Sequence, residues 1–177
     1  MAKAAHKLTA APIALGLALA GCAGPVETHT GFSGRTGLPA TALVVATPNE
    51  NPGATSQMAR DVVAQELVQQ GYTVAERGGA TVLVTVAERP ATVEVRSAQD
   101  AVVSPEKRKR LLQSCADRTH RLTLVMLAPD GEVSRAWAEE RHCKGTLAQS
   151  LKPLAQSAIA SLAGKQAAGV VLRSGRD

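Results

Sequence analysis

Aromatic residues are scarce in this chain. They make up 2% of the 177 residues, with one Trp, one Tyr and one Phe. A hydrophobic core must therefore be built from aliphatic side chains, chiefly Ala, Val and Leu. Proteins that bind nucleic acid usually combine aromatic stacking platforms with a strongly basic stripe. Since the formal net charge is only +5, we expect no binding to nucleic acid.

No apolar run is long enough to span a membrane. The longest, Leu8 to Ala20, falls short of the roughly 20 residues that a spanning helix needs. It follows two basic residues, Lys3 and Lys7, and it closes with Leu19-Ala20-Gly21-Cys22. A basic start, a short apolar run and small residues before a cleavage point are typical of a secretory signal peptide. We therefore expect residues 1–21 to be removed on export.

Sequence motifs of catalysis and cofactor binding are also missing. The chain has no Ser-His-Asp spacing, no phosphate-binding loop and no dinucleotide fingerprint. Glu139 and Glu140 could serve as acid and base, but we expect them to form ion pairs with Arg118 or Arg121 across neighbouring strands. Trp137 is expected to anchor the core or an interface. The sequence thus predicts a protein that is not an enzyme and has no catalytic residue, cofactor or metal.

Of the three cysteines, one belongs to the N-terminal apolar segment and the other two lie in the expected domain. Cys22 ends the apolar run, which leaves Cys115 and Cys143 as a pair in an oxidising compartment after export. We interpret this pair as a disulfide, which would close a loop of about 28 residues and contribute roughly 3–4 kcal/mol. Two free buried thiols, or a metal site completed by His120 and His142, are the alternatives. Zinc takes three or four such ligands at suitable spacing, so we expect no metal.

Hydrophobic periodicity predicts two helices and several strands. Apolar residues recur at helical spacing in residues 54–70 and 151–162. We expect the second helix to begin near Ser150, or earlier between Thr146 and Gln149, because Pro153 is tolerated only in a first turn. Short apolar or alternating runs predict strands at residues 41–47, 72–75, 80–87, 92–97, 118–128 and 132–142.

The order of these elements predicts the fold class. Residues 129–131, Pro-Asp-Gly, favour a hairpin between the last two strands. Residues 98–117 fit either a loop or a short helix beginning at Ser104. With two striped helices, the chain should form an α+β, two-layer sandwich: a mostly antiparallel sheet packed by two amphipathic helices.

Composition divides the chain into four segments. Residues 1–21 are the signal peptide. Residues 22–40 are rich in Gly, Pro, Ser and Thr, and we expect a flexible linker there. Residues 41–163 should form one α+β domain, and residues 164–177 a flexible C-terminal tail.

Three features together resemble one class of proteins. They are the Leu19–Cys22 motif, a helix ending in residues 70–72 followed by the strand 80–84, and the hairpin 122–137 that leads into the final helix. The chain is similar in these respects to small bacterial envelope lipoproteins with a lipobox signal peptide and a domain of unknown function. The resemblance implies diacylglycerol on the Cys22 thiol and acylation of the new N-terminus, with palmitate for example. Ala23 after the cysteine implies the outer membrane, with the domain facing the periplasm.

The basic cluster Lys107, Arg108, Lys109 and Arg110 is the one dense run of charge. Such a run is usually a solvated surface, but it could also contact an anionic envelope ligand. The leading hypothesis is a non-enzymatic, membrane-anchored lipoprotein that acts as an accessory or scaffold of an envelope complex, with an envelope protein as its partner. The alternative hypothesis is a binding module for an anionic envelope ligand through residues 107–110.

Overall fold

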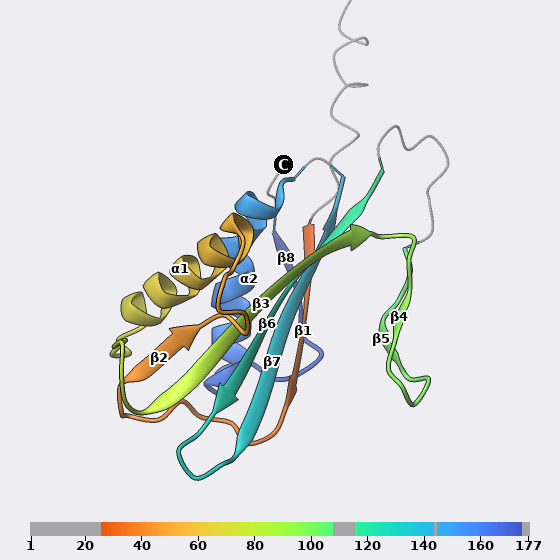
Figure 1. Ribbon diagram of the computed structural model, residues 1–177. Coiled ribbons are helices and arrows are strands. Elements are labelled where there is room, and N and C mark those ends of the chain that lie inside the picture. Colours follow the sequence, from red (N-terminus) through yellow and green to blue (C-terminus); the bar gives the residue numbers. More distant parts are fainter. Residues whose placement is uncertain (1–25, 108–115, 144, 175–177) are drawn as a thin grey trace, which may run out of the picture.

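The computed structural model describes residues 26–107, 116–143 and 145–174 (Figure 1). The fold is α+β, as the sequence predicts: a mostly antiparallel sheet of six strands is combined with two helices. The strand order in the sheet is β2-β3-β6-β7-β1-β8, and β2–β3 is its parallel pair. The elements are β1 (Val26–Ser33), β2 (Leu43–Ala46), α1 (Ala54–Gln69), β3 (Ala80–Pro90), β4 (Val95–Arg96), β5 (Val102–Ser104), β6 (Arg118–Leu127), β7 (Val133–His142), α2 (Leu147–Leu162) and β8 (Val171–Ser174).

Strands β6 and β7 form the predicted hairpin at the centre of the sheet. Their register places Leu122 opposite Ala138 and Leu124 opposite Ala136, and all four side chains are fully buried. The turn contains Gly131 at a φ of 84°, a left-handed conformation that glycine adopts without steric cost. Alternating buried and exposed positions along both strands give the sheet one apolar face.

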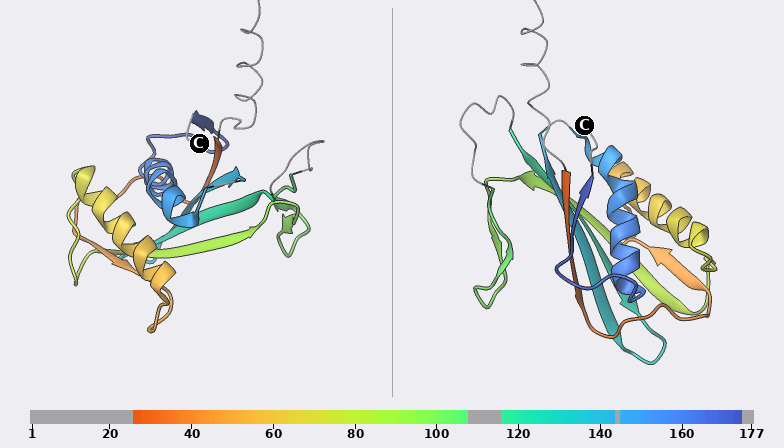
Figure 2. Two further views of the ribbon diagram at one scale, coloured as in Figure 1. Left: turned by 90° about the horizontal axis from the view of Figure 1, so that it is seen from above. Right: turned by 180° about the vertical axis from the view of Figure 1, so that it is seen from behind.

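Both helices pack on this apolar face (Figure 2). Helix α1 contacts β2 and β3, and α2 contacts β1, β6 and β7 as well as α1. Each fully buried leucine contributes about 1.5–3 kcal/mol relative to an exposed one. The buried apolar side chains of the helices are Ala59, Val63, Leu67, Leu151, Leu154, Ala155, Ala158, Ile159 and Leu162. No helix in the described ranges is both long and apolar enough to cross a bilayer.

Helix α2 begins at the earlier of the two positions that the sequence allows. Thr146 is its N-cap and forms a capping box with Gln149, so that two backbone N–H groups of the first turn gain acceptors. The expected start near Ser150 is therefore wrong, and Pro153 lies inside the helix. Because proline has no N–H, the carbonyl four residues earlier loses its intrahelical partner.

Two segments that we expected to be flexible contain strands of the sheet. Strand β1 occupies residues 26–33 of the expected linker 22–40 and pairs with β7 along Glu27–Ser33. Strand β8 occupies part of the expected tail 164–177 and pairs with β1. Both predictions are wrong here because neighbouring strands supply the backbone hydrogen bonds, which composition does not reveal. The domain therefore starts at β1 and ends at β8 within the described residues.

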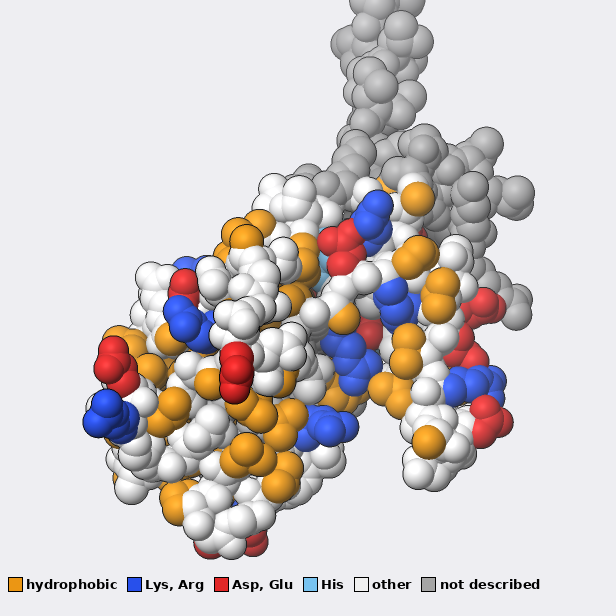
Figure 3. All heavy atoms as spheres, in the orientation of Figure 1, with side chains coloured by type: hydrophobic (Ala, Val, Ile, Leu, Met, Phe, Trp, Pro, Cys, Tyr) orange, Lys and Arg blue, Asp and Glu red, His pale blue; other side chains and the backbone are white. Residues whose placement is uncertain are grey.

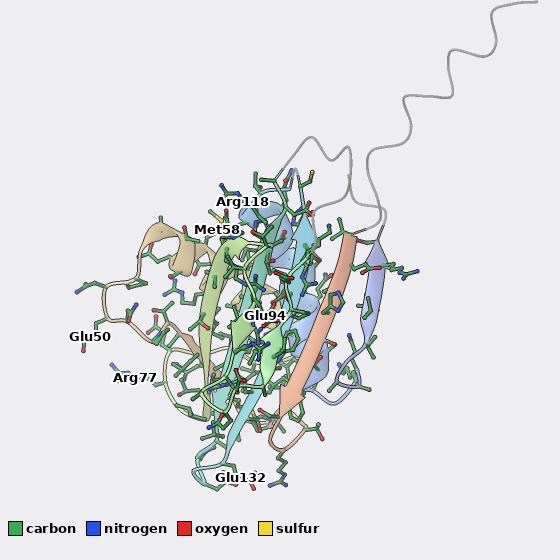
Figure 4. All side chains as sticks on the ribbon, turned by 90° about the vertical axis from the view of Figure 1, so that its right-hand side faces the viewer. Glu50, Met58, Arg77, Glu94, Arg118 and Glu132 are labelled. Carbon is green, nitrogen blue, oxygen red and sulfur yellow. The ribbon has the colours of Figure 1, made fainter. Side chains whose placement is uncertain are left out.

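Other boundaries also change between sequence and structure. Residues 92–107 contain the small hairpin β4–β5, which stands in front of the main sheet at Glu94 (Figure 4). Ser104 ends β5, so the helix considered from this residue does not form over residues 105–107. The expected strand at residues 72–75 is reduced to a single bridge from Val74 to the edge strand β2.

Candidate functional site

The sheet face opposite the helices carries a concentration of arginine. Alternate positions on β3, β6 and β7 place these side chains on one surface, because successive residues of a strand point to opposite faces. Figure 3 shows Lys and Arg side chains along the boundary between the main body and the β4–β5 hairpin. We define the arginine face by the residues Arg89, Arg121, Arg135, Trp137, Glu139 and Arg141.

Glu139 is the centre of this face. Its side chain is only 2% exposed, and one oxygen accepts a 3.0 Å hydrogen bond from the Arg141 guanidinium. Arg121, directly opposite on β6, lies 3.5 Å from the other oxygen, which confirms this predicted cross-strand pair. Arg89 is 3.8 Å away. One buried carboxylate is thus shared by three guanidinium groups.

The β4–β5 hairpin completes the surroundings of Glu139. The Ser104 hydroxyl lies 2.6 Å from each carboxylate oxygen of Glu139. Arg89 donates to that same hydroxyl and to the Val93 carbonyl. These polar contacts join the hairpin to the sheet, because each buried polar group finds its partner on the other element.

Trp137 lies beside the arginines, and a glycine on the neighbouring strand leaves room for its ring. Gly31 is opposite on β1, and a Cβ atom there would approach the indole Cε2 to 2.3 Å. The Arg121 guanidinium carbon lies 4.2 Å from the centroid of the Trp137 ring, a distance typical of cation–π attraction. Trp137 therefore holds Arg121 in place and does not belong to the helix-facing core.

Positive charge exceeds negative charge on the arginine face. Four guanidinium groups and one carboxylate leave a formal charge of +3. Burial lowers the pKa of Arg121, with Glu139 opposing this effect and the neighbouring charges of Arg89 and Arg135 adding to it. The face is therefore suited to an anion, which would offset the excess charge.

A second polar cluster lies on the helix-facing side of the same sheet end. The Ser150 hydroxyl of α2 is 2.9 Å from His120 Nδ1 and 2.8 Å from His142 Nε2. His120 Nε2 lies 3.7 Å from a Glu88 oxygen. Burial lowers the pKa of His120, and His142 lowers it further, whereas Glu88 and Glu140 oppose the shift. In a catalytic triad, an imidazole and a carboxylate activate a serine hydroxyl as the nucleophile, and this cluster contains all three kinds of group.

Two members of this second cluster are inaccessible to a substrate in the structure. Both His120 and Ser150 have no exposed surface. Their contacts instead connect β6 and β7 to the first turn of α2. Nearby, Thr28 donates a 2.8 Å hydrogen bond to the buried Glu140, which adds β1 to the same polar contact region.

A groove of about 500 Å³ runs between α2 and the edge of the sheet at β8. Strand β8 is the outermost strand on this side, and its Val171 and Leu172 are each 44% exposed. The groove thus joins an apolar edge to the surface of α2. Its lining residues are Thr28, Lys152, Pro153, Gln156, Ser157, Gln166, Leu172 and Ser174.

The site residues predicted from sequence fall partly outside the described ranges. Cys22 and Cys115 lie outside them, as do Arg108, Lys109 and Arg110. Cys143 is described and is disulfide-bonded, while its pairing with Cys115 stays a prediction.

Lys107 is the one described member of the predicted basic cluster. Its ammonium group lies 2.7 Å from an Asp117 oxygen, so it is paired within the domain. Among residues 26–107, 116–143 and 145–174, no group of three or more His, Cys, Asp or Glu side chains is arranged to hold a metal ion.

The arginine face is a feature that sequence reasoning missed. Arg135, Trp137, Glu139 and Arg141 alternate along β7, and this period of two places all four on one side of a strand. The alternation was available in the sequence. The inclusion of Arg89 and Arg121 depends on strand register and could not be read from spacing.

Comparison with known proteins gives a likeness of fold. No protein-family model matches the chain, and no curated protein matches it. The PelC dodecamer from Paraburkholderia phytofirmans, in space group P6, is 16% identical with a TM-score of 0.45 over 77% of this chain and 99% of the PelC chain. A PDZ domain protein from Parabacteroides distasonis is 8% identical with a TM-score of 0.50, over 84% of this chain and 39% of that one. These similarities carry no assignment of activity.

Proposed function

We propose that the protein is a non-enzymatic lipoprotein of the bacterial envelope, anchored through Cys22 to the outer membrane and facing the periplasm. In this role it is an accessory or scaffold of an envelope protein complex. The observation that carries the proposal is the lipobox-like Leu19–Cys22 motif, and the structure adds that strand β1 begins at Val26, four residues after the cysteine. Only residues 23–25 then separate the lipidated cysteine from the sheet. A fully extended chain would place the two Cα atoms at most about 14 Å apart.

This short connection changes the way the anchor acts. A flexible linker through residue 40 would let the domain move away from the bilayer, whereas a three-residue connection holds the start of β1 beside it. Two or three acyl chains on one residue give firm attachment, because each buried methylene contributes about 0.8 kcal/mol. We propose that the domain rests on the membrane surface in a fixed orientation.

The proposed architecture is a two-layer sandwich whose outermost described strand, β8, can accept a partner. Both helices contact the same sheet face, and the described sheet ends at β8. An exposed strand edge can accept a further strand from another protein. The exposed side chains of Val171 and Leu172 and the neighbouring groove favour β8 and α2 as the docking surface.

The non-enzymatic part of the proposal is supported by the burial of the Ser150 hydroxyl. This hydroxyl is fully buried between His120 and His142, so a substrate cannot reach it without local unfolding. The alternative function through residues 107–110 draws no support from Lys107, which is already paired with Asp117.

The partner interaction is tested by crosslinking intact membranes and purifying the full-length protein. We expect a stable complex with the wild type, and its loss in Leu172→Glu, which places a charge on the β8 edge. Val68→Glu is the matched control, because Val68 is 57% exposed on α1 and lies away from β8. Absence of a complex, or a complex that Leu172→Glu leaves intact, would contradict this proposal.

A further inference from the structure

We propose that the arginine face is a binding site for a phosphate group, centred on Arg121 and flanked by Arg135 and Arg141. This site lies on the sheet face opposite the helices and differs from the basic run 107–110. It depends neither on the lipid anchor nor on a protein partner at β8. It assigns a ligand chemistry to residues that the proposed scaffold role does not use.

The balance of charge supports phosphate over a single carboxylate. Glu139 supplies one negative charge to four arginines, and the remaining formal charge is +3. The side chains of Arg89, Arg121 and Arg141 are 17%, 19% and 15% exposed, so water screens them only in part. A phosphate carries between one and two negative charges near neutral pH, and guanidinium groups bind it in a bidentate manner.

Arg121, Arg135 and Arg141 each keep N–H groups that no described residue accepts a hydrogen bond from. Arg141 directs Nε and Nη2 to Glu139, which leaves Nη1. Arg121 approaches Glu139 through Nη1 and stacks on Trp137. Among the described residues, no hydrogen bond or ion pair occupies Arg135. Arg121 and Arg135 are near enough for their charges to interact, so their remaining N–H groups can bind one oxyanion. Arg141 and Arg89 are engaged by Glu139 and by the β4–β5 hairpin and contribute mainly charge.

Two sources could supply the phosphate group: a soluble phosphate ester, or the headgroup of an anionic phospholipid. Arg141 pairs in register with Glu27, next to the first residue of β1. The arginine face therefore begins at the sheet end that would adjoin the bilayer if Cys22 carries lipid. Both sources share the same recognition chemistry, and separate measurements distinguish them.

Trp137 reports directly on this site, because it is the single tryptophan of the chain and contacts Arg121. The full-length protein in neutral detergent would be titrated with sodium phosphate against sodium chloride at constant ionic strength. We expect a saturable change in tryptophan fluorescence with phosphate only. Loss of one charged hydrogen-bond donor in Arg135→Gln should weaken this binding about tenfold without changing the thermal midpoint.

Arg77→Gln is the matched control, since it removes one exposed arginine from the loop before β3, outside the arginine face (Figure 4). It should bind phosphate as the wild type does. No saturable response to phosphate, or equal affinity of Arg135→Gln and Arg77→Gln, would overturn the proposal.

Vesicles identify the source of the phosphate. With Cys22→Ser, which removes the lipid anchor, binding to phosphatidylglycerol vesicles but not to phosphatidylcholine vesicles would support a headgroup, provided that Arg135→Gln weakens it. A response to soluble phosphate without vesicle binding would support a soluble phosphate ester. Because the anchor is absent, this result is independent of whether Cys22 is lipidated in cells.

Discussion

Replacing Glu139 by Gln should strongly destabilise the domain. Glutamine keeps the shape and one acceptor oxygen, so Ser104 and Arg141 can still donate to it. The change therefore removes the negative charge while most of the packing remains. It leaves Arg89, Arg121 and Arg141 without the carboxylate that they share in the folded state.

The expected magnitude follows from burial. Removing one partner of a buried ion pair costs about 3–5 kcal/mol. The Glu139 side chain is 2% exposed, but the guanidinium groups of its three partners keep 15–19% exposure and can regain some water. We therefore expect the lower end, about 3 kcal/mol. For a domain of this size, that loss corresponds to about 6–12 °C in thermal midpoint.

Urea unfolding followed by Trp137 fluorescence and by circular dichroism would measure this loss. Glu132→Gln is the matched control, because the Glu132–Arg35 pair is 50% and 73% exposed. Such a surface pair contributes at most about 1 kcal/mol. A loss below about 1 kcal/mol for Glu139→Gln, or equal losses in the two variants, would refute the assignment of Glu139 as the shared anion of the arginine face.

Three further predictions concern the backbone and the buried histidine. Gly31→Ala should displace the Trp137 ring and destabilise the fold by about 1–3 kcal/mol, with a red shift of the tryptophan fluorescence. Gly53→Ala is the control: Gly53 has open space around it, so the fluorescence should stay unchanged. Burial lowers the pKa of His120 from its ordinary value near 6.5, so the unfolded chain binds the proton more readily. The free energy of unfolding should be highest above pH 6.5 and should fall by at most about 1.4 kcal/mol per pH unit as the pH drops toward the lowered pKa. A flat profile of unfolding free energy from pH 7.5 to 5.5 would contradict this. The His120→Gln variant should show a smaller slope. Pro153→Ala should restore a hydrogen bond inside α2 and stabilise the fold by about 1–3 kcal/mol, and an unchanged or lower thermal midpoint would speak against that reasoning.

Elements with strong local signals were predictable from sequence. The apolar stripe of α2 and the alternation on β6 and β7 each depend on residues close together in the chain. A helix or hairpin buries its own apolar pattern, so the pattern records the element directly. The α+β class followed from these elements.

The strands β1 and β8 illustrate what local patterns do not reveal. On β1 the buried helix-facing positions include Thr28 and Thr30, which look polar in sequence. Thr30 finds its acceptor at the Val170 carbonyl, and Thr28 finds Glu140. These partners lie more than a hundred residues away, so composition alone indicated a linker where the sheet supplies the missing contacts.

The arginine face was hidden for a related reason. The Arg121–Glu139 pair could be predicted from the hairpin, because the turn sets its register. The convergence of Arg89 and Ser104 on the same carboxylate required the β4–β5 hairpin, whose position no local pattern encodes. A cluster assembled from four strands is visible only once strand order and register are known.

Intact mass of the protein purified from membranes tests the proposed anchoring most directly, measured before and after reduction with thiol labelling. We predict the mass of residues 22–177 plus acyl chains, with two thiols that become reactive only on reduction. Cys22→Ser should abolish the acyl mass. A wild-type protein that retains residues 1–21 and carries no lipid would contradict the envelope lipoprotein account.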